Sequence, residues 1–247
     1  MATALPFKQH GQIKRLGFVA WLALLPLLLA LLLRPVSTNL TRAGTLAVLL
    51  ALWVSSLLVF WKIKTIRVLC LITSLIACAF IILPGRNIDS MSLRRAYIDS
   101  LSRYEGTKYV WGGENKLGID CSGLVRRGLI DADFKRGLLT VNPALMRAGG
   151  ALWWHDCPAK GLLNQDCRQT REILSASSIN NLEHSAILPG DIAVTSDGLH
   201  TLAYIGDKMW IEADPNLGGV VKVKVPAVDN YYFNTPVHLM RWNQFER

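Results

Sequence analysis

The chain has 247 residues, 51% of them apolar, and a net charge of +9. A basic balance of this kind is typical of nucleic-acid-binding proteins, so its distribution along the chain matters. Residues 1–84 carry eight Lys and Arg and no Asp or Glu, whereas residues 85–247 carry 19 basic and 18 acidic residues. The excess charge therefore belongs to the most apolar third, where basic residues flank membrane spans. This excludes a phosphate-binding groove and a nucleic-acid partner.

Three long apolar segments follow one another in the first third of the chain. They predict transmembrane helices at about 17–33, 46–63 and 67–84, because each approaches the ~20 residues that a helix needs to cross a bilayer core. A single segment after basic residues would be typical of a cleaved secretory signal. Three in succession, without a small-residue cleavage site after the first, favour retained membrane anchors. The alternative is a buried helical bundle in a soluble protein.

The three spans would place the two chain termini on opposite sides of a membrane. With a cytoplasmic N-terminus, the cytoplasmic segments hold six basic residues and the outer segments five. The positive-inside rule then gives a narrow preference for this orientation. We expect residues 85–247 to lie outside the cytoplasm.

Residues 85–247 predict one α+β domain that begins with two helices. The apolar spacing over residues 91–104 predicts the first helix. A second is expected over 121–130, with Asp120 as its N-cap because a side-chain oxygen there can accept a hydrogen bond from the first turn.

The second half of this domain predicts an insertion followed by an antiparallel sheet. Residues 131–186 mix short apolar patches with polar runs and are expected to form a loop-rich insertion. From Pro189 onward, short apolar runs predict strands, including a hairpin over 200–213 that turns at Gly206-Asp207. This order of elements favours an α+β fold in which a helix that bears the cysteine packs on an antiparallel sheet.

Cys157 and Cys167 lie ten residues apart in the polar segment CPAKGLLNQDC. In an oxidising compartment this spacing could close a small disulfide loop. Two free thiols are an alternative. A zinc site with His155 and His184 is conceivable, although the spacing fits no strong ligand pattern.

Cys121 has the position of a candidate nucleophile. A cysteine in the first turn of a helix faces the positive end of the helix dipole, which favours thiolate over thiol. Backbone N–H groups at such a terminus can also hold a developing oxyanion. The small neighbours Ser122 and Gly123 leave room for a substrate. The alternative is a buried, inert thiol.

A thiol nucleophile needs a base, and His200 at the start of a predicted strand can supply it. A third group should then orient the imidazole ring. If the hairpin turns at Gly206-Asp207, residues whose numbers sum to about 413 face each other, which places Glu212 opposite His200. Asp214 lies on the same sheet face and is the alternative third residue.

The segment YVWGGENKLGIDCSGLV resembles the signature of the NlpC-type cell-wall peptidases, a papain-like group of bacterial cysteine hydrolases. The later segments LPGDIAV and HTLAYIGDKMWIEA are similar to the next two blocks of that family, in the same order. The resemblance runs over about 97–213 and is interrupted by residues 131–186. The three predicted spans lie outside it.

This resemblance implies a papain-like fold and a role for each matching residue. Cys121 matches the nucleophile, His200 the base, and Tyr109 a tyrosine that lines the site and helps to hold the oxyanion, beside Ser122. Glu212 stands where the family most often has a histidine. No metal or other cofactor is implied.

The resemblance also implies a substrate and a location. Members of the family hydrolyse amides in peptidoglycan stem peptides, commonly between D-γ-glutamyl and a diamino acid. The protein would then be a multi-pass protein of the bacterial cytoplasmic membrane that meets a stem peptide outside it. Two alternatives remain: a papain-like acyltransferase or hydrolase acting on another amide or ester near the bilayer, and a non-catalytic scaffold associated with the wall.

Overall fold

The structure is a computed structural model that describes residues 7–87 and 89–246. Residues 1–6 of the predicted range 1–84, and residues 88 and 247 of the predicted range 85–247, lie outside the described residues. The chain separates into two compact units, of which the first comprises Met1–Arg34 and Thr38–Ile82 and the second comprises Pro35–Ser37 and Leu83–Arg247. Each unit is described by itself.

The first unit consists of the three helices α1 (Phe7–Leu33), α2 (Asn39–Val59) and α3 (Lys64–Ile82). All three are long and apolar enough to cross a membrane. The second helix begins and ends earlier than the predicted span 46–63. Thr38 explains the early start, because its hydroxyl accepts from the N–H of Thr41 and the Thr41 side chain bonds back to the N–H of Thr38.

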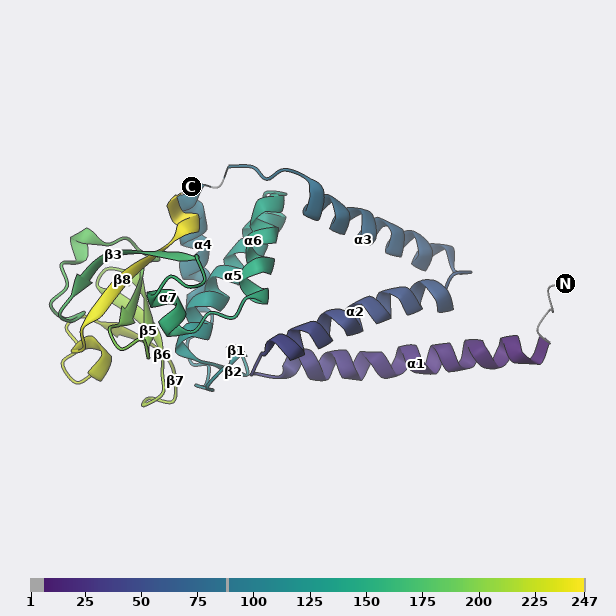
Figure 1. Ribbon diagram of the computed structural model, residues 1–247, viewed down its shortest axis with the longest axis horizontal. Coiled ribbons are helices and arrows are strands. Elements are labelled where there is room, and N and C mark those ends of the chain that lie inside the picture. The colour runs from purple at the N-terminus through teal and green to yellow at the C-terminus, as the bar shows by residue number, and fades with distance from the viewer. Residues whose placement is uncertain (1–6, 88, 247) are drawn as a thin grey trace. The chain divides into compact units, whose positions relative to one another are not determined.

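Helices α1 and α2 lie side by side, and α3 diverges from α2 (Figure 1). The α1–α2 contact is fixed by the Trp21 indole N–H, which donates to the Ser56 hydroxyl over 2.8 Å. Phe18 and Phe60 surround the same indole ring. Elsewhere these helices present leucine and isoleucine side chains outward, as at Leu75, which is 71% exposed.

The described residues of the second unit form four α-helices and a six-stranded sheet. The helices are α4 (Ser90–Ser102), α5 (Cys121–Leu139), α6 (Pro143–Trp154) and α7 (Ala159–Leu163). The sheet has the order β3-β8-β4-β5-β6-β7, and all neighbouring strands are antiparallel. Its strands are β3 (Thr170–Ala176), β4 (Ile192–Thr195), β5 (Thr201–Gly206), β6 (Met209–Asp214), β7 (Gly219–Lys224) and β8 (Val237–Trp242). A small hairpin, β1 (Glu114–Asn115) and β2 (Gly118–Ile119), precedes α5. Three short 3₁₀ helices complete the unit: η1 (His184–Ala186), η2 (Tyr231–Phe233) and η3 (Asn243–Glu246).

Residues 131–186 are expected to be rich in loops, but in the structure helices make up a large part of them. The cysteine helix continues to Leu139, and the segment also contains α6, α7 and the edge strand β3. Asn142 caps α6 and Pro143 occupies its first turn, which is a regular helix start. Because every residue of α6 except Arg147 is apolar or glycine, the sequence shows no contrast between a polar and an apolar face, and this hides the buried face that packs on α5.

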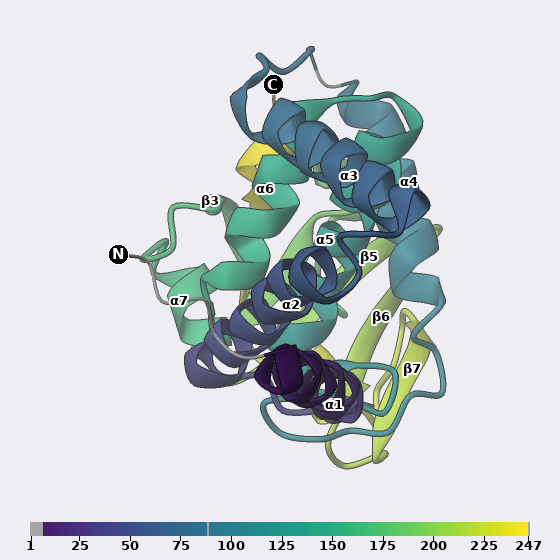
Figure 2. The ribbon, with the colours of Figure 1, turned by 90° about the vertical axis from the view of Figure 1, so that its right-hand side faces the viewer.

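The main core lies between the helices and one face of the sheet. Helices α4, α5 and α6 lie on one side of the strands in Figure 1, and Figure 2 shows α5 beside α4 in front of β5 and β6. Gly128 of α5 permits the close approach of α4, since a Cβ there would lie 2.6 Å from a methyl group of Leu101. A second apolar cluster, which includes Trp210, Phe233 and Leu239, covers the other face. The start of α5 is thus held against a sheet that is packed on both sides.

Candidate active site

The start of α5 is built by one side chain, that of Asp120. Its Oδ1 accepts the backbone N–H of Gly123 and the hydroxyl of Ser122, and its Oδ2 accepts the N–H of Gly112 over 2.8 Å. Burial raises the pKa of Asp120, and these three hydrogen bonds oppose the rise. The carboxylate therefore caps the helix and also fastens the preceding glycine turn to it.

Cys121 is the first residue of α5 and its side chain is 6% exposed. The thiol donates to the carbonyl of Leu199, with 3.8 Å between sulfur and oxygen. Within the described residues, the backbone N–H groups of Cys121 and Ser122 find no acceptor. N–H groups of the first turn are left free at a helix N-terminus, so these two can donate to an oxyanion that forms beside the sulfur.

His200 lies directly before β5 and is 2% exposed. Its backbone is fixed by Thr195 at the end of β4: the N–H of His200 donates to Thr195 Oγ1 over 3.0 Å, and its carbonyl accepts the N–H of Thr195 over 3.0 Å. This short turn brings the imidazole to the N-terminus of α5.

Glu212 of β6 is fully buried, and its Oε2 lies 2.7 Å from Nε2 of His200. The expected register is off, because Glu212 pairs with Leu202 and not with His200. The hairpin turns at Asp207 and Lys208, both with positive φ, one residue later than predicted. The contact still forms diagonally, since a glutamate side chain can reach a neighbour two residues along the facing strand.

Two residues that the sequence analysis did not identify complete this side of the site. The Asn230 amide N–H donates to Oε1 of Glu212 over 2.7 Å. The ring of Tyr232 stacks on the imidazole of His200, with 3.6 Å between ring centroids and an interplanar angle of 14°. Both residues lie in the connection between β7 and β8, and nothing in the local sequence DNYYFNTP indicates a site.

The charge state of His200 follows from these contacts. Burial is the largest influence and by itself lowers the pKa of His200, because it disfavours the charged ring. Hydrogen bonds and charges from Cys121 and Glu212 act in the opposite direction and raise the pKa to about 9. The imidazole therefore carries a proton at neutral pH. Since Nε2 is bonded to Glu212, Nδ1 is the nitrogen left for Cys121.

A thiol at a helix start, a buried imidazole and a buried carboxylate can together supply a nucleophile, a base and a group that orients the base. A model of the NlpC/P60 family matches residues 106–241, which is more than half of the chain. The chain belongs to the NlpC/P60 family. The α+β fold with a cysteine helix packed on an antiparallel sheet is the expected one.

Several solved structures are similar to this NlpC/P60 chain. NlpC1 from Trichomonas vaginalis is 22% identical over 65% of this chain and 45% of its own, with a TM-score of 0.39. The peptidoglycan hydrolase RipB from Mycobacterium tuberculosis is 18% identical over 65% of this chain and 69% of its own, with a TM-score of 0.39. The P60 domain of the M. avium subspecies paratuberculosis antigen MAP1204 is 18% identical over 62% of this chain and 97% of its own, with a TM-score of 0.37.

The chain thus spans less than half the length of the first of these structures. No curated protein matches it.

Tyr109 approaches the NlpC/P60 site from the segment before β1. Its backbone N–H donates to the carbonyl of Gly218 over 2.8 Å, which holds it beside the β6–β7 turn. Burial, followed by the charges of Cys121 and Asp120, raises the pKa of Tyr109 to about 12. The hydroxyl therefore keeps its proton near the sulfur and can donate it to an oxyanion.

Asp214, the alternative third residue, is turned away from His200. Its Oδ1 accepts the N–H groups of Asn216 over 2.6 Å and Leu217 over 3.4 Å, which closes the β6–β7 turn. The geometry pairs Glu212, and not Asp214, with the imidazole.

Cys157 and Cys167 form a disulfide in the structure, with 6.2 Å between their Cα atoms. They are therefore neither free thiols nor available as zinc ligands. The disulfide closes the segment that holds α7.

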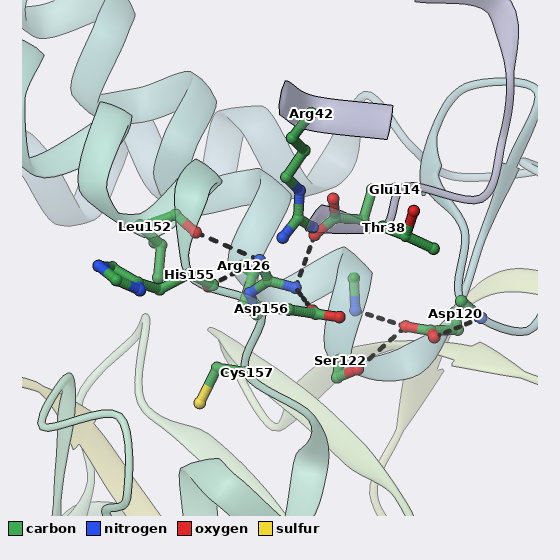
Figure 3. A network of polar contacts seen from close by, with 12 residues as sticks. Thr38, Arg42, Glu114, Asp120, Ser122, Arg126, Leu152, His155, Asp156 and Cys157 are labelled. Carbon is green, nitrogen blue, oxygen red and sulfur yellow. Dashed lines mark hydrogen bonds and ion pairs between the residues drawn. The ribbon is translucent and has the colours of Figure 1, made fainter. Parts of the chain in front are cut away.

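Arg126 connects this segment to α5 (Figure 3). Its guanidinium is 1% exposed and lies 2.6 Å from a carboxylate oxygen of Glu114 and 2.6 Å from one of Asp156. It also donates to the carbonyls of Leu152 and His155, each over 3.2 Å. One buried cation thus joins β1, α5 and the residues that follow α6.

Proposed function

We propose that the protein is a membrane-anchored cysteine peptidase that hydrolyses an amide bond in peptidoglycan stem peptides, between D-γ-glutamyl and a diamino acid. The observation that carries this proposal is the buried series Cys121, His200 and Glu212 at the start of α5. It lies within an NlpC/P60 domain, and one structure with this fold is a peptidoglycan hydrolase.

In the first half of the reaction, the Cys121 thiolate attacks the carbonyl carbon of the scissile amide. The resulting oxyanion would accept hydrogen bonds from the backbone N–H of Cys121 and from the Tyr109 hydroxyl. The protonated His200 then gives its Nδ1 proton to the leaving amine, and the C–N bond breaks. A thioester between Cys121 and the glutamyl group remains.

In the second half, neutral His200 removes a proton from a water molecule that attacks the thioester carbonyl. The C–S bond breaks, the thiolate is restored and the imidazole is again protonated. Glu212 stabilises the imidazolium at both stages, and it does so more strongly than a neutral third residue would, because its charge is buried. This is consistent with the raised pKa of His200.

We further propose that residues 1–84 are a membrane domain and residues 85–247 the hydrolase domain, which faces the periplasm or cell wall. The three long apolar helices support the anchor by length and composition. The Cys157–Cys167 disulfide supports the side, because disulfides persist in oxidising compartments and are rare in the cytoplasm. A wall substrate would be found on that side.

The test is digestion of purified muropeptides by the full chain in detergent, followed by mass spectrometry. New free amino groups on the diamino acid are expected with the natural protein and not with Cys121→Ala. Unchanged muropeptides would contradict the proposal and favour an acyl group other than that of the stem peptide.

A further inference from the structure

The turn between β4 and β5 carries two groups that lie at the nucleophile. One is the imidazole of His200, the base of the proposed reaction, and the other is the carbonyl of Leu199, which accepts the thiol of Cys121 over 3.8 Å. Within the turn, Oδ1 of Asp197 accepts the N–H of Leu199 over 2.9 Å and the hydroxyl of Thr195 over 2.6 Å. Because these bonds are internal to the turn and the end of β4, what packs against the turn helps to set where its tip lies.

Helix α7 packs directly against the tip of this turn. A Cβ atom on Gly198 would lie 3.1 Å from Cα, Cβ and Cγ of Lys160, which is closer than ordinary van der Waals contact. Gly198 also has a φ of +73°, a backbone conformation that glycine adopts without strain. The turn and α7 therefore touch closely, and a shift of α7 would pass to Leu199 and His200, the next two residues along the turn.

Helix α7 cannot hold this place by itself. It has five residues and no side-chain cap at its N-terminus, and so short a helix is not stable in isolation. After it the chain turns back through Gln165 and Arg168, whose φ angles are 60° and 52°. This left-handed backbone disfavours residues that carry a Cβ atom. The segment therefore needs a constraint from outside the helix.

The Cys157–Cys167 disulfide supplies that constraint. Cys157 is fully buried in the main core. Gly161 of α7 lies over the disulfide, since a Cβ atom there would be 3.3 Å from the sulfur of Cys157 and 3.4 Å from that of Cys167. Lys160, the neighbour of Gly161, is the residue that touches the turn. A continuous series of contacts thus runs from the disulfide through α7 to the β4–β5 turn.

The disulfide is open to reduction from one side, because Cys167 is half-buried whereas Cys157 is not exposed. A thiolate of a dithiol reagent can attack the Cys167 sulfur, and the S–S bond breaks with Cys157 as the leaving thiolate. The second thiol of the reagent then displaces Cys167. The reagent ends as a cyclic disulfide, and the protein has gained two electrons and two protons as two thiols.

We propose that α7 positions the base of the site and that the disulfide holds α7 in place, so that the protein is fully active only while Cys157 and Cys167 are joined. This inference rests on the proposed function for the role of His200. It adds regulation by redox state: the hydrolase would be weak in the cytoplasm, where disulfides are rare, and would gain activity in an oxidising compartment.

The test follows the acylation of Cys121 by p-nitrophenyl acetate in the full chain in detergent, since p-nitrophenolate reports on the site without a stem peptide. Cys157→Ala/Cys167→Ala should lower the rate about ten-fold, because a displacement of about 1 Å can cost about 10²-fold. Cys70→Ala/Cys78→Ala removes two free cysteines of α3 and keeps the disulfide, so it should match the natural chain. Equal rates for the two double variants would overturn the proposal.

The pH dependence of the rate separates positioning from a loss of stability. Burial lowers the pKa of His200, and the contacts with Cys121 and Glu212 raise it to about 9. A displaced turn weakens these contacts, so the alkaline limit of the pH–rate profile should move to lower pH in Cys157→Ala/Cys167→Ala. A limit that stays in place, at a temperature below the onset of unfolding, would also overturn the proposal, because a disulfide that only stabilises the fold would not move it.

Reduction repeats the test in the natural chain. Treatment with dithiothreitol, removed by gel filtration before the assay, should lower the rate as far as Cys157→Ala/Cys167→Ala does, and that variant should not respond. A natural chain whose disulfide is reduced by thiol titration without loss of rate would contradict the inference.

The proposed function fails in a different way. If the disulfide controls acylation by the ester as expected while muropeptides stay unchanged, the positioning role of α7 stands and the peptidase assignment falls.

Discussion

The two sides of the candidate site are built in different ways. The nucleophile side is local: Gly112, Asp120, Cys121 and Gly123 lie within twelve positions, and one carboxylate organises them. The base side is assembled from distant parts of the chain, since His200 is oriented by Glu212 and covered by residues of the β7–β8 connection.

The two sides therefore show two ways of positioning a side chain. A helix cap fixes a nucleophile through backbone geometry that the neighbouring residues determine by themselves. A base on a sheet depends on strand register and on loops that close over it, so its orientation is a property of the whole domain. We therefore expect changes on the nucleophile side to act on chemistry or on one helix end, and changes on the base side to act through the state of the imidazole.

The largest effect is expected from Cys121→Ala. Removal of the nucleophile should lower the rate of stem-peptide cleavage by about four orders of magnitude or more. The release of free amino groups measures this. The near-ultraviolet circular dichroism spectrum should not change, because His200 stays fixed by Glu212 and Thr195 when the thiol is removed. Retained activity would remove the nucleophile side from the mechanism.

Glu212→Gln should lower kcat by about 10²- to 10⁴-fold, by analogy with other third residues of catalytic triads. Glutamine keeps an acceptor for Asn230 but removes the charge that supports the imidazolium. The pKa of His200 should then fall below about 9, and the alkaline limit of the pH–rate profile should move to lower pH. A profile that stays in place would show that the carboxylate does not set the state of the base.

Glu212→Gln should also change how the free energy of unfolding depends on pH. The folded pKa of His200 is raised from 6.5 to about 9, so the stability it contributes is present below pH 6.5 and is lost as the pH rises through 9. Urea unfolding of the natural chain should show this decline. Glu212→Gln should flatten it, whereas Asp207→Asn, which lies on the exposed turn, should leave it unchanged.

Tyr232→Leu tests whether the covering loop positions the base. Loss of the stacked ring removes about 1 kcal/mol of interaction with the imidazole, so kcat should fall by up to about ten-fold. Tyr232→Phe retains the ring and should stay near the natural rate. If both variants fall equally, the hydroxyl and not the stack is what matters.

Asp120→Ala should have the smallest effect on the base and a local effect on the helix. The loss of the cap should cost about 1–2 kcal/mol of unfolding free energy. Asp120→Asn, which keeps an acceptor for Gly123, is the matched control and should cost less. An alkaline pH limit that moved in Asp120→Ala would contradict the independence of the two sides.

Much of the fold could be predicted from the sequence because its signals are local. Asp120 and the small residues after it indicate the start of α5, and the strands β4 to β8 follow period-two or short apolar runs. Hydropathy places the second apolar segment too late, because the Thr38 capping box sets where α2 begins. The sequence of residues 131–186 does not reveal α6, because this helix is apolar or glycine at nearly every position and buries few large side chains.

The remaining contacts of the site could not be predicted from the local sequence. The positive-φ turn at Asp207 and Lys208 shifts the hairpin register, and the Glu212 contact depends on side-chain length as much as on pairing. Asn230 and Tyr232 reach the site from a loop whose path is set by packing against the far face of the sheet. No spacing in the sequence encodes that path.

Arg126 has a consequence for anyone who would shorten this domain. The segment that follows α5 looks dispensable in the sequence, and a designer seeking a smaller hydrolase would remove it first. That deletion would take away Asp156 and two carbonyl acceptors, and it would strand a guanidinium beside Glu114 at 1% exposure. Each buried donor left without an acceptor costs about 1–3 kcal/mol, so a trimmed version must supply new acceptors for Arg126.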